Sequence, residues 1–302
     1  MVPPHTEAGN ENGNHNGKRR TFETVVTDVV LETPDAATLF LHARPEDREY
    51  LAGQFLTIDP HQFDALRNLI GYLEDVKGHK ETARAYSMAS GPHDRELAIT
   101  VKIEPYISGE TKFPPLLSPF LVRGCFRGMP MTVSGHSGHY AIGPDIAEKT
   151  DHLIHIAAGS GIVPNYAMLR WALEVGLPLR HTLIYGNKSW RDVIYRRQLD
   201  DLVDRFPDKL RVVHALTRET DFQQCAGRDV RRGRVTEALL REVIEDPRSA
   251  LVYTCGPAIT RWEKIRAREA GLVPAPRFIE STIAALEAIG VPKDRVHKEA
   301  YG

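Results

Sequence analysis

One short stretch of the chain combines residue types that suit the binding of a flat, phosphorylated molecule. A cation, an aromatic ring and a hydroxyl group occur within four positions, Arg84-Ala85-Tyr86-Ser87. The guanidinium of arginine matches phosphate oxygens, and a tyrosine ring offers a flat face for stacking. Because strand side chains alternate, we expect one face of a strand here to carry the cation and a hydroxyl. The pattern predicts a cofactor-binding strand, although a rim strand with a surface arginine would show the same string.

A second stretch joins a continuous apolar run to a helical pattern through small residues. The run at 153–157 is typical of a buried strand, and it is followed closely by Gly159-Ser160-Gly161. Small residues let backbone N–H groups approach a phosphate, so the loop predicts dinucleotide binding. An ordinary tight turn would also use these residues. We expect Pro164 at the first position of the helix that follows.

Alternating strand and helix patterns fill the second half of the chain. We expect strands at 153–157, 181–185, 210–216 and 250–254, with helices that include 193–206 and 234–244. This alternation is typical of a doubly wound parallel sheet, whose ligands bind beyond the carboxyl ends of the strands. Four residues follow expected strands in that position: Gly159, Gly186, Thr217 and Gly256.

The first half of the chain has a different pattern, short apolar alternations separated by turn residues. It predicts an antiparallel β-barrel domain at 21–147, before the α/β domain at 148–302. Residues 1–20 are polar, and we expect a disordered tail. Between two barrel strands, apolar residues at helical spacing predict an inserted amphipathic helix at about 62–78. This helix would pack on the barrel, cover the edge of a cofactor or dock a partner.

Composition argues against several classes of function. A net charge of −1 gives no support for a nucleic-acid partner. No apolar run approaches the ~18 residues of a membrane span. The cysteines Cys125, Cys225 and Cys255 lie far apart, so we expect no thiolate metal site. Few cysteines and no apolar signal core lead us to expect a cytoplasmic protein.

Four motifs occur in the order found in the ferredoxin–NADP reductase family, which the chain resembles over about residues 22–302. They are Gly53-Gln54-Phe55, the stretch 84–90, the stretch 157–164 and Cys255-Gly256-Pro257. The resemblance implies a barrel that binds FAD and a doubly wound domain that binds NAD(P)H. It also implies an oxidoreductase, here without the fused ferredoxin domain that the family often carries.

The resemblance assigns roles to individual residues. It implies that Ser87 hydrogen-bonds near flavin N5 and that Cys255 positions the nicotinamide C4 without covalent catalysis. Gly256 and Pro257 would lie on the nicotinamide side, and Tyr301 belongs to a C-terminal stretch that often folds back to the flavin. Ser118 would hold the flavin pyrophosphate at a helix start, with an ordinary N-cap as the alternative.

Nucleotide preference follows from a third group of residues. The stretches Thr217-Arg218-Glu219 and Gly233-Arg234-Val235 resemble the family's NADPH-using bacterial members. The resemblance implies that arginines from these two places hold the 2′-phosphate. The second strand of the expected sheet ends in Tyr185-Gly186-Asn187-Lys188, without the acidic residue that favours NADH. We therefore expect NADPH, with NADH as the alternative.

The sequence predicts a reductase that passes hydride from NADPH to FAD and then electrons to a separate ferredoxin or flavodoxin. Related alternatives are the reductase component of a multicomponent oxygenase and an enzyme that supplies free reduced flavin, and FMN could replace FAD. An alternative of another class is a non-enzymatic module that binds flavin or nucleotide and regulates a partner.

Overall fold

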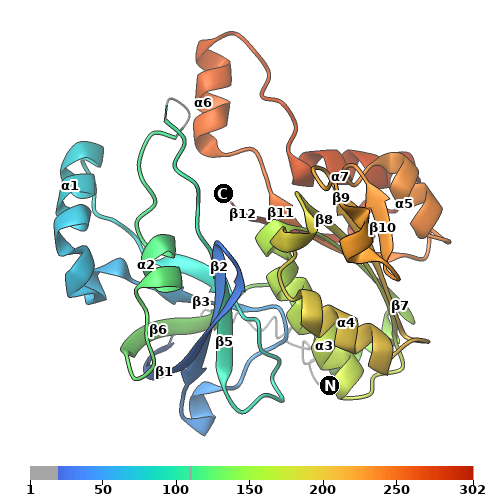
Figure 1. The fold of residues 1–302 in the computed structure, drawn as a ribbon, viewed down its shortest axis with the longest axis horizontal. Helices are drawn as coiled ribbons and strands as arrows, with labels where there is room; N and C mark the ends of the chain where they lie inside the picture. Colours follow the sequence, from blue (N-terminus) through green and yellow to red (C-terminus); the bar gives the residue numbers. More distant parts are fainter. Residues whose placement is uncertain (1–19, 109–110, 302) are drawn as a thin grey trace, which may run out of the picture.

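The computed structural model describes residues 20–108 and 111–301, which form two six-stranded sheets side by side (Figure 1). The tail expected at residues 1–20 lies outside the described residues, except for Arg20, which begins the first strand. The expected domain boundary at 147/148 stays a prediction and falls between the two sheets. Among the described residues, no helix is both long and apolar enough to cross a membrane. The expected cytoplasmic location stays a prediction.

The first sheet is antiparallel, in the order β4-β3-β6-β1-β2-β5. A bridge between Met88 and Ile99 joins the end of β4 to β5, and the N–H of Ala89 donates to the carbonyl of Ala98 at 2.7 Å. These contacts close the sheet into the expected barrel. Its strands are β1 (Arg20–Thr33), β2 (Ala36–His42), β3 (Phe55–Ile58), β4 (Arg84–Ser87), β5 (Leu97–Lys102) and β6 (Pro130–Ser137).

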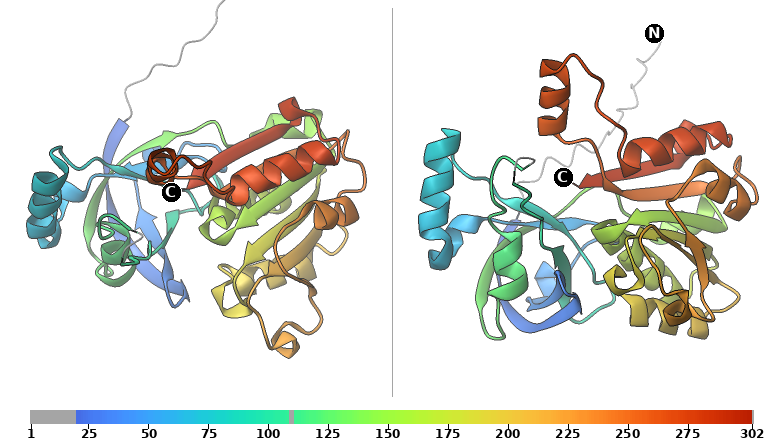
Figure 2. Two further views of the ribbon diagram at one scale, coloured as in Figure 1. Left: turned by 90° about the horizontal axis from the view of Figure 1, so that it is seen from above. Right: turned by 45° about the horizontal axis from the view of Figure 1, so that its top comes forward.

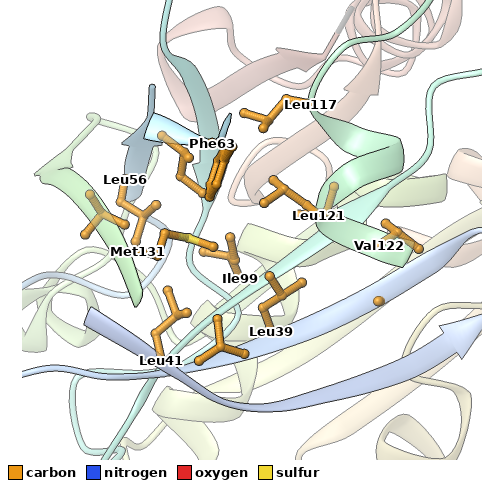
Figure 3. Close-up of a cluster of buried hydrophobic side chains, with 14 of the residues drawn as sticks. Leu39, Leu41, Leu56, Phe63, Ile99, Leu117, Leu121, Val122 and Met131 are labelled. Atoms are coloured by element: carbon orange, nitrogen blue, oxygen red, sulfur yellow. The ribbon is translucent and has the colours of Figure 1, made fainter. Parts of the chain in front are cut away.

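One apolar core fills the barrel and extends under its helices. Side chains from alternating strand positions, such as Leu39, Leu41 and Ile99, are fully buried there. The short helix α2 (Ser118–Arg123) adds Leu121 and Val122 from one end, as Figure 3 shows. This packing fixes the frame on which β3 and β4 lie.

The inserted helix is present as α1 (Arg67–Lys77), after two short 3-10 turns. Its apolar side packs Ile70 and Leu73 into the barrel core, and Gly78 ends it in the left-handed conformation with φ 71°. The helix stands on the outer side of the barrel, away from the second sheet (Figure 1). The expected packing of α1 on the barrel is therefore confirmed.

The second sheet is entirely parallel, in the order β10-β9-β8-β7-β11-β12. The chain runs from β7 to β8 on one side and reaches β11 on the other, so the strand order reverses between β7 and β11. The strands are β7 (His152–Ala158), β8 (Arg180–Asn187), β9 (Leu210–Leu216), β10 (Asp229–Arg232), β11 (Leu251–Pro257) and β12 (Val296–Tyr301). We did not predict β10 and β12.

Helices cover both faces of this sheet. One face packs against α3 (Ile162–Glu174) and α4 (Arg196–Arg205). The opposite face packs against α5 (Glu237–Val243) and α7 (Phe278–Ala288), and Figure 2 shows α7 across the sheet from α3 and α4. The doubly wound fold is confirmed. A further helix, α6 (Arg261–Glu269), has no buried residue and projects from the sheet.

Several helix starts differ from the predicted positions. Pro164 is the third residue of α3, because a 3-10 turn at Gly159–Gly161 comes first. Helix α5 starts after Thr236, whose hydroxyl accepts the N–H of Leu239 at 3.3 Å. Helix α4 starts after Tyr195, which has a left-handed conformation with φ 60°. These local turns shorten the helices, which apolar spacing alone cannot show.

Candidate active site

Ser87 and the end of β12 meet where the barrel touches the parallel sheet. The Ser87 hydroxyl, which is buried, donates to the Glu299 carboxylate at 3.2 Å. It also shares a hydrogen bond with the Tyr301 hydroxyl. Since β12 pairs with β11 in the register Cys255–Glu299 and Pro257–Tyr301, the same contacts bring Ser87 to the Cys255 strand. The structure thus joins four of the predicted site residues: Ser87, Cys255, Pro257 and Tyr301.

Cys255 is fully buried at this junction. Burial, with the nearby Glu299 carboxylate, raises the pKa of its thiol well above the usual value, against a hydrogen bond with Tyr301 that lowers it. A neutral thiol is a poor nucleophile, and this fits a positioning role better than covalent chemistry.

Glu299 can hold a proton at neutral pH. Burial raises its pKa to about 7, although hydrogen bonds from Ser87 and Tyr301 act in the opposite direction. The carboxyl group therefore titrates near physiological pH within hydrogen-bond reach of the Ser87 hydroxyl. Such a pair can deliver or accept a proton at Ser87 Oγ.

The loop Gly159-Ser160-Gly161 has open space beside Gly159 and none beside Gly161. A Cβ on Gly161 would lie 2.1 Å from the carbonyl oxygen of Cys255, so only glycine lets α3 begin this close to β11. Gly159 has φ +54°, and a Cβ there would meet no atom within 4 Å. The loop thus opens away from the protein at the point where the strand order reverses, as a phosphate site requires.

Asn165 stabilises this loop through hydrogen bonds. Its side-chain amide donates to the Gly161 carbonyl at 3.0 Å, and its oxygen accepts from Tyr140 at 3.0 Å. His155 Nδ1 lies 3.1 Å from the same oxygen. Asn165 and His155 are fully buried, and His155 is a hydrogen-bonded core histidine. Tyr140 belongs to the segment after β6, so the loop is tied to the barrel side of the molecule.

Arg84 lies at the start of β4 and is partly exposed. Its guanidinium donates to Glu81 at 2.6 Å and to the carbonyl and hydroxyl of Thr82 at 2.6 and 2.8 Å. The expected single face for cation and hydroxyl is wrong, because Ser87 comes three residues after Arg84 and strand side chains alternate. Arg84 shares its face with Tyr86, which packs on the barrel core, and Ala85 is exposed.

Ser118 does not cap a helix. It is the first residue of α2, and its buried hydroxyl accepts the N–H of Glu104 at 3.2 Å. The N-cap alternative is therefore wrong, because Leu117 occupies the cap position without a side-chain hydrogen bond. A role for Ser118 with the pyrophosphate stays a prediction without support from its contacts.

The predicted 2′-phosphate residues lie farther along the same edge of the sheet. Thr217 and Arg218 follow β9, and their N–H groups donate to the carbonyls of Asn187 and Lys188 at 3.1 and 2.7 Å. Arg218 and Arg234 are exposed, and within the described part of the chain neither forms an ion pair. Arg231, by contrast, pairs with Asp229 and Glu242.

Some site residues were not found from the sequence. Glu299 belongs to a C-terminal stretch that the family resemblance linked to the flavin, but its link to Ser87 was not predicted. Asn165 and Glu81 also escaped prediction, because each acts on a residue that comes close only through a turn or a helix. The clearest available signal was the Glu299–Tyr301 spacing, which places both side chains on one strand face.

Comparison with known proteins agrees with this geometry. Residues 155–261 match the family model of the oxidoreductase NAD-binding domain. The chain is 27% identical over 286 residues to a component of the 1,2-phenylacetyl-CoA epoxidase of Escherichia coli, covering 93% of this chain and 68% of that protein. It is 30% identical over 283 residues to the 3-ketosteroid-9-alpha-monooxygenase ferredoxin reductase component of Mycolicibacterium smegmatis, covering 93% and 65%. The chain thus spans about two thirds of the length of these relatives.

Two solved structures share the fold. The FAD/NAD-binding domain of nitric oxide dioxygenase from Vibrio cholerae has a TM-score of 0.66 at 20% identity, covering 93% of this chain and 98% of that one. Ferredoxin–NADP+ reductase from Plasmodium falciparum, in complex with 2′P-AMP, has a TM-score of 0.62 at 17% identity, covering 93% of this chain and 96% of that one. At these identities they establish the fold alone. FAD and NAD(P) are the cofactors expected of this class. The chain is an oxidoreductase that carries an NAD-binding domain and has the two-domain fold of ferredoxin–NADP reductase-like FAD/NAD-binding reductases.

Proposed function

We propose that the chain passes hydride from NADPH to FAD and then delivers electrons to a separate protein acceptor. The observation that carries this proposal is the contact of Ser87 with Glu299 and Tyr301. Through it, the predicted flavin strand and the predicted nucleotide sheet share one partly buried cluster. In this proposal the barrel domain spans 21–147 and the nucleotide domain 148–302.

The residues of the chain fit both cofactors. Arg84, Ala85, Tyr86 and Ser87 would hold the flavin, and the open loop Gly159-Ser160-Gly161 would hold the nucleotide phosphates. When bound, the flavin would supply the redox chemistry, since it can take two electrons as one hydride and give them up one at a time. The protein would orient the two rings, exclude water through the buried Cys255 and Gly256 and the partly buried Tyr301, and hold a proton on Glu299 beside Ser87 Oγ.

A preference for NADPH is part of the proposal. The exposed Arg218 and Arg234 lie at the same edge of the sheet, and their guanidinium groups suit a phosphate dianion. The second strand of the sheet, β8, ends at Asn187 and leads into Lys188, so no carboxylate occupies the place that would favour NADH.

The acceptor would be an iron–sulfur or flavodoxin-type protein. A second candidate is that the chain serves as the reductase component of an oxygenase. Two observations favour it, because one relative is named as part of an epoxidase and another as the ferredoxin reductase component of a monooxygenase.

A visible spectrum of the purified protein tests the proposal, followed by anaerobic addition of NADPH and then NADH. We expect a yellow protein whose flavin absorbance is bleached faster by NADPH. A protein that binds no added flavin and oxidises neither nucleotide would contradict the proposal and favour the non-enzymatic module.

A further inference from the structure

The inserted segment 59–83 connects two adjacent barrel strands, β3 and β4, by a long excursion that includes α1. Hairpin connections are usually 2–5 residues long, so this one needs a physical explanation. Its start and end lie together, because Ile58 pairs with Arg84 in the sheet. Residues at either end of the segment therefore lie close to Arg84.

Polar contacts lead through the segment toward Arg84. Asp59 Oδ1, just after β3, lies 2.6 Å from His61 Nδ1, and His61 Nε2 lies 2.8 Å from Glu74 Oε1 on α1. The same Glu74 oxygen accepts the backbone N–H of Glu81 at 2.8 Å. The backbone after α1 is thus fixed to the helix, and the position of Glu81 depends on α1.

Glu81 has a buried carboxylate between two cations. Its side chain is only 1% exposed; Oε1 pairs with Lys77, at the end of α1, and Oε2 pairs with Arg84 at 2.6 Å. Burial would raise its pKa, but the hydrogen bonds and charges of Lys77 and Arg84 hold the pKa below the usual value. Glu81 is therefore ionised at neutral pH, and each carboxylate oxygen has its own cation.

The arrangement leaves Arg84 both oriented and available. Two cations and one carboxylate keep a net charge of +1 in the Lys77–Glu81–Arg84 cluster. The guanidinium has five N–H donors, and the described residues accept three hydrogen bonds from it. Its side chain is 39% exposed, so the remaining donors can reach a ligand. Because a free arginine loses rotamer freedom on binding, contacts that fix it beforehand favour binding.

We propose that Glu81 is a positioning residue: held by Lys77 and the inserted helix, it orients Arg84 toward the phosphate of the bound flavin. This inference rests on the proposed function, because it assumes that Arg84 binds a flavin phosphate. It gives the insertion a role at the flavin site in addition to its packing on the barrel. Nothing in it requires α1 to touch the flavin.

Flavin affinity tests the inference, since positioning and simple electrostatics predict opposite results. Glu81→Gln removes a negative charge, which by charge alone would tighten phosphate binding. If Glu81 positions Arg84, FAD affinity instead falls, by about tenfold, the lower end of the loss seen when outer-shell partners of metal ligands are removed. Titrations followed by flavin fluorescence with FAD, FMN and riboflavin measure this. Riboflavin has no phosphate, so its affinity is expected to change less than about twofold.

Glu81→Asp separates the two effects without changing charge. It shortens the reach of the carboxylate by one methylene, so FAD affinity is expected to fall several-fold with riboflavin binding unchanged. The matched control is Asp64→Asn, which breaks an exposed ion pair with Arg67 within the same insertion. This control is expected to bind all three flavins like the wild type.

Three results would overturn the inference: unchanged or tighter FAD binding by Glu81→Gln, equal losses for FAD and riboflavin, or wild-type FAD affinity in Glu81→Asp. If Glu81→Gln does not fold, the Glu81→Asp result decides. If the wild type binds FAD normally and both Glu81 variants bind it like the Asp64→Asn control, only this inference is contradicted. A wild-type protein that binds neither FAD nor riboflavin contradicts the proposed function as well.

Discussion

The Ser87 hydroxyl donates a hydrogen bond to the Glu299 carboxylate at 3.2 Å, across 212 residues of sequence. Ser87 ends a barrel strand and Glu299 lies in the edge strand of the parallel sheet. The contact therefore joins the two halves of the molecule at the residues proposed for hydride transfer. Ser87 and Glu299 can therefore act together only when both halves of the chain are folded.

Replacing Ser87 by alanine tests the role of this contact in transfer. If Ser87 Oγ exchanges a proton with Glu299 during flavin reduction, Ser87→Ala is expected to slow reduction by about 10²- to 10⁴-fold, the usual size of general acid–base effects. Anaerobic stopped-flow absorbance measures the rate. The rates are compared for protein loaded with FAD, since Ser87 is also proposed to hold the flavin. An unchanged reduction rate would exclude Ser87 from the chemistry.

Glu299 predicts a specific dependence of stability on pH. Its pKa is raised from 4.5 to about 7, so the folded state binds a proton more tightly than the unfolded state. The contribution of Glu299 to the free energy of unfolding is fully present below pH 4.5 and is lost as the pH rises through 7. Each pKa unit is worth about 1.4 kcal/mol, so a rise from 4.5 to about 7 corresponds to a loss of at most about 3.5 kcal/mol.

Urea unfolding of wild type and Glu299→Gln between pH 5 and 8 measures this contribution. The wild-type free energy of unfolding should fall relative to that of the variant as the pH rises. Parallel pH profiles would show that Glu299 has an ordinary pKa.

Gly161→Ala is expected to weaken nucleotide binding more than flavin binding. The new Cβ would collide with the Cys255 carbonyl oxygen, so the loop must shift from β11. NADPH should bind at least about tenfold more weakly, since a shift of about 1 Å at a positioning group can cost 10²-fold. Isothermal titration of the oxidised protein with NADP+ measures the same loss, since both forms of the nucleotide carry the phosphates that the loop would hold.

The matched control is Gly176→Ala, after α3. Gly176 has φ +80° and open space for a Cβ, so the substitution strains the backbone without a collision. It should lower stability by about 1 kcal/mol and leave nucleotide affinity unchanged. Equal nucleotide affinities for both variants and the wild type would contradict the assigned role of the loop.

Arg218→Ala and Arg234→Ala test nucleotide preference. Loss of a charge-assisted hydrogen bond to the 2′-phosphate costs about 1.5–3 kcal/mol, so the KM for NADPH should rise by about 10- to 100-fold. The KM for NADH should not change. Steady-state kinetics with both nucleotides measure the ratio, and Arg231→Ala, whose guanidinium already pairs with Asp229 and Glu242, is the control. Equal effects on both nucleotides would contradict the preference for NADPH.

The sequence predicted the fold well, because each half has a distinct periodicity. Alternation in the barrel and continuous apolar runs such as 153–157 predicted both sheets. The strands β10 and β12 were missed, since Asp229–Arg232 and Val296–Tyr301 are short, charged edge strands without an apolar run. Helix α6 buries no residue, so it has no apolar stripe to predict it.

The candidate site was predictable only where a motif is local. Ser87, Cys255 and the loop at Gly159 each belong to a short string with its own chemistry. The contact of Glu299 with Ser87 joins residues 212 positions apart, so nothing in the sequence pairs them. Glu81 lies close in sequence to Lys77 and Arg84, but its role depends on a backbone turn after α1 that apolar spacing does not show. The alternative that Ser118 is an ordinary N-cap is wrong, because Ser118 is already the first residue of its six-residue helix and Leu117 holds the cap position.

Hydride transfer to the flavin is tested most directly by anaerobic single-turnover reduction of the flavin-loaded protein by NADPH, with and without deuterium at nicotinamide C4. We expect NADPH to bleach the flavin and deuterium to slow the bleaching. A protein that holds flavin but is bleached by neither NADPH nor NADH would contradict hydride transfer at the Ser87–Glu299 junction.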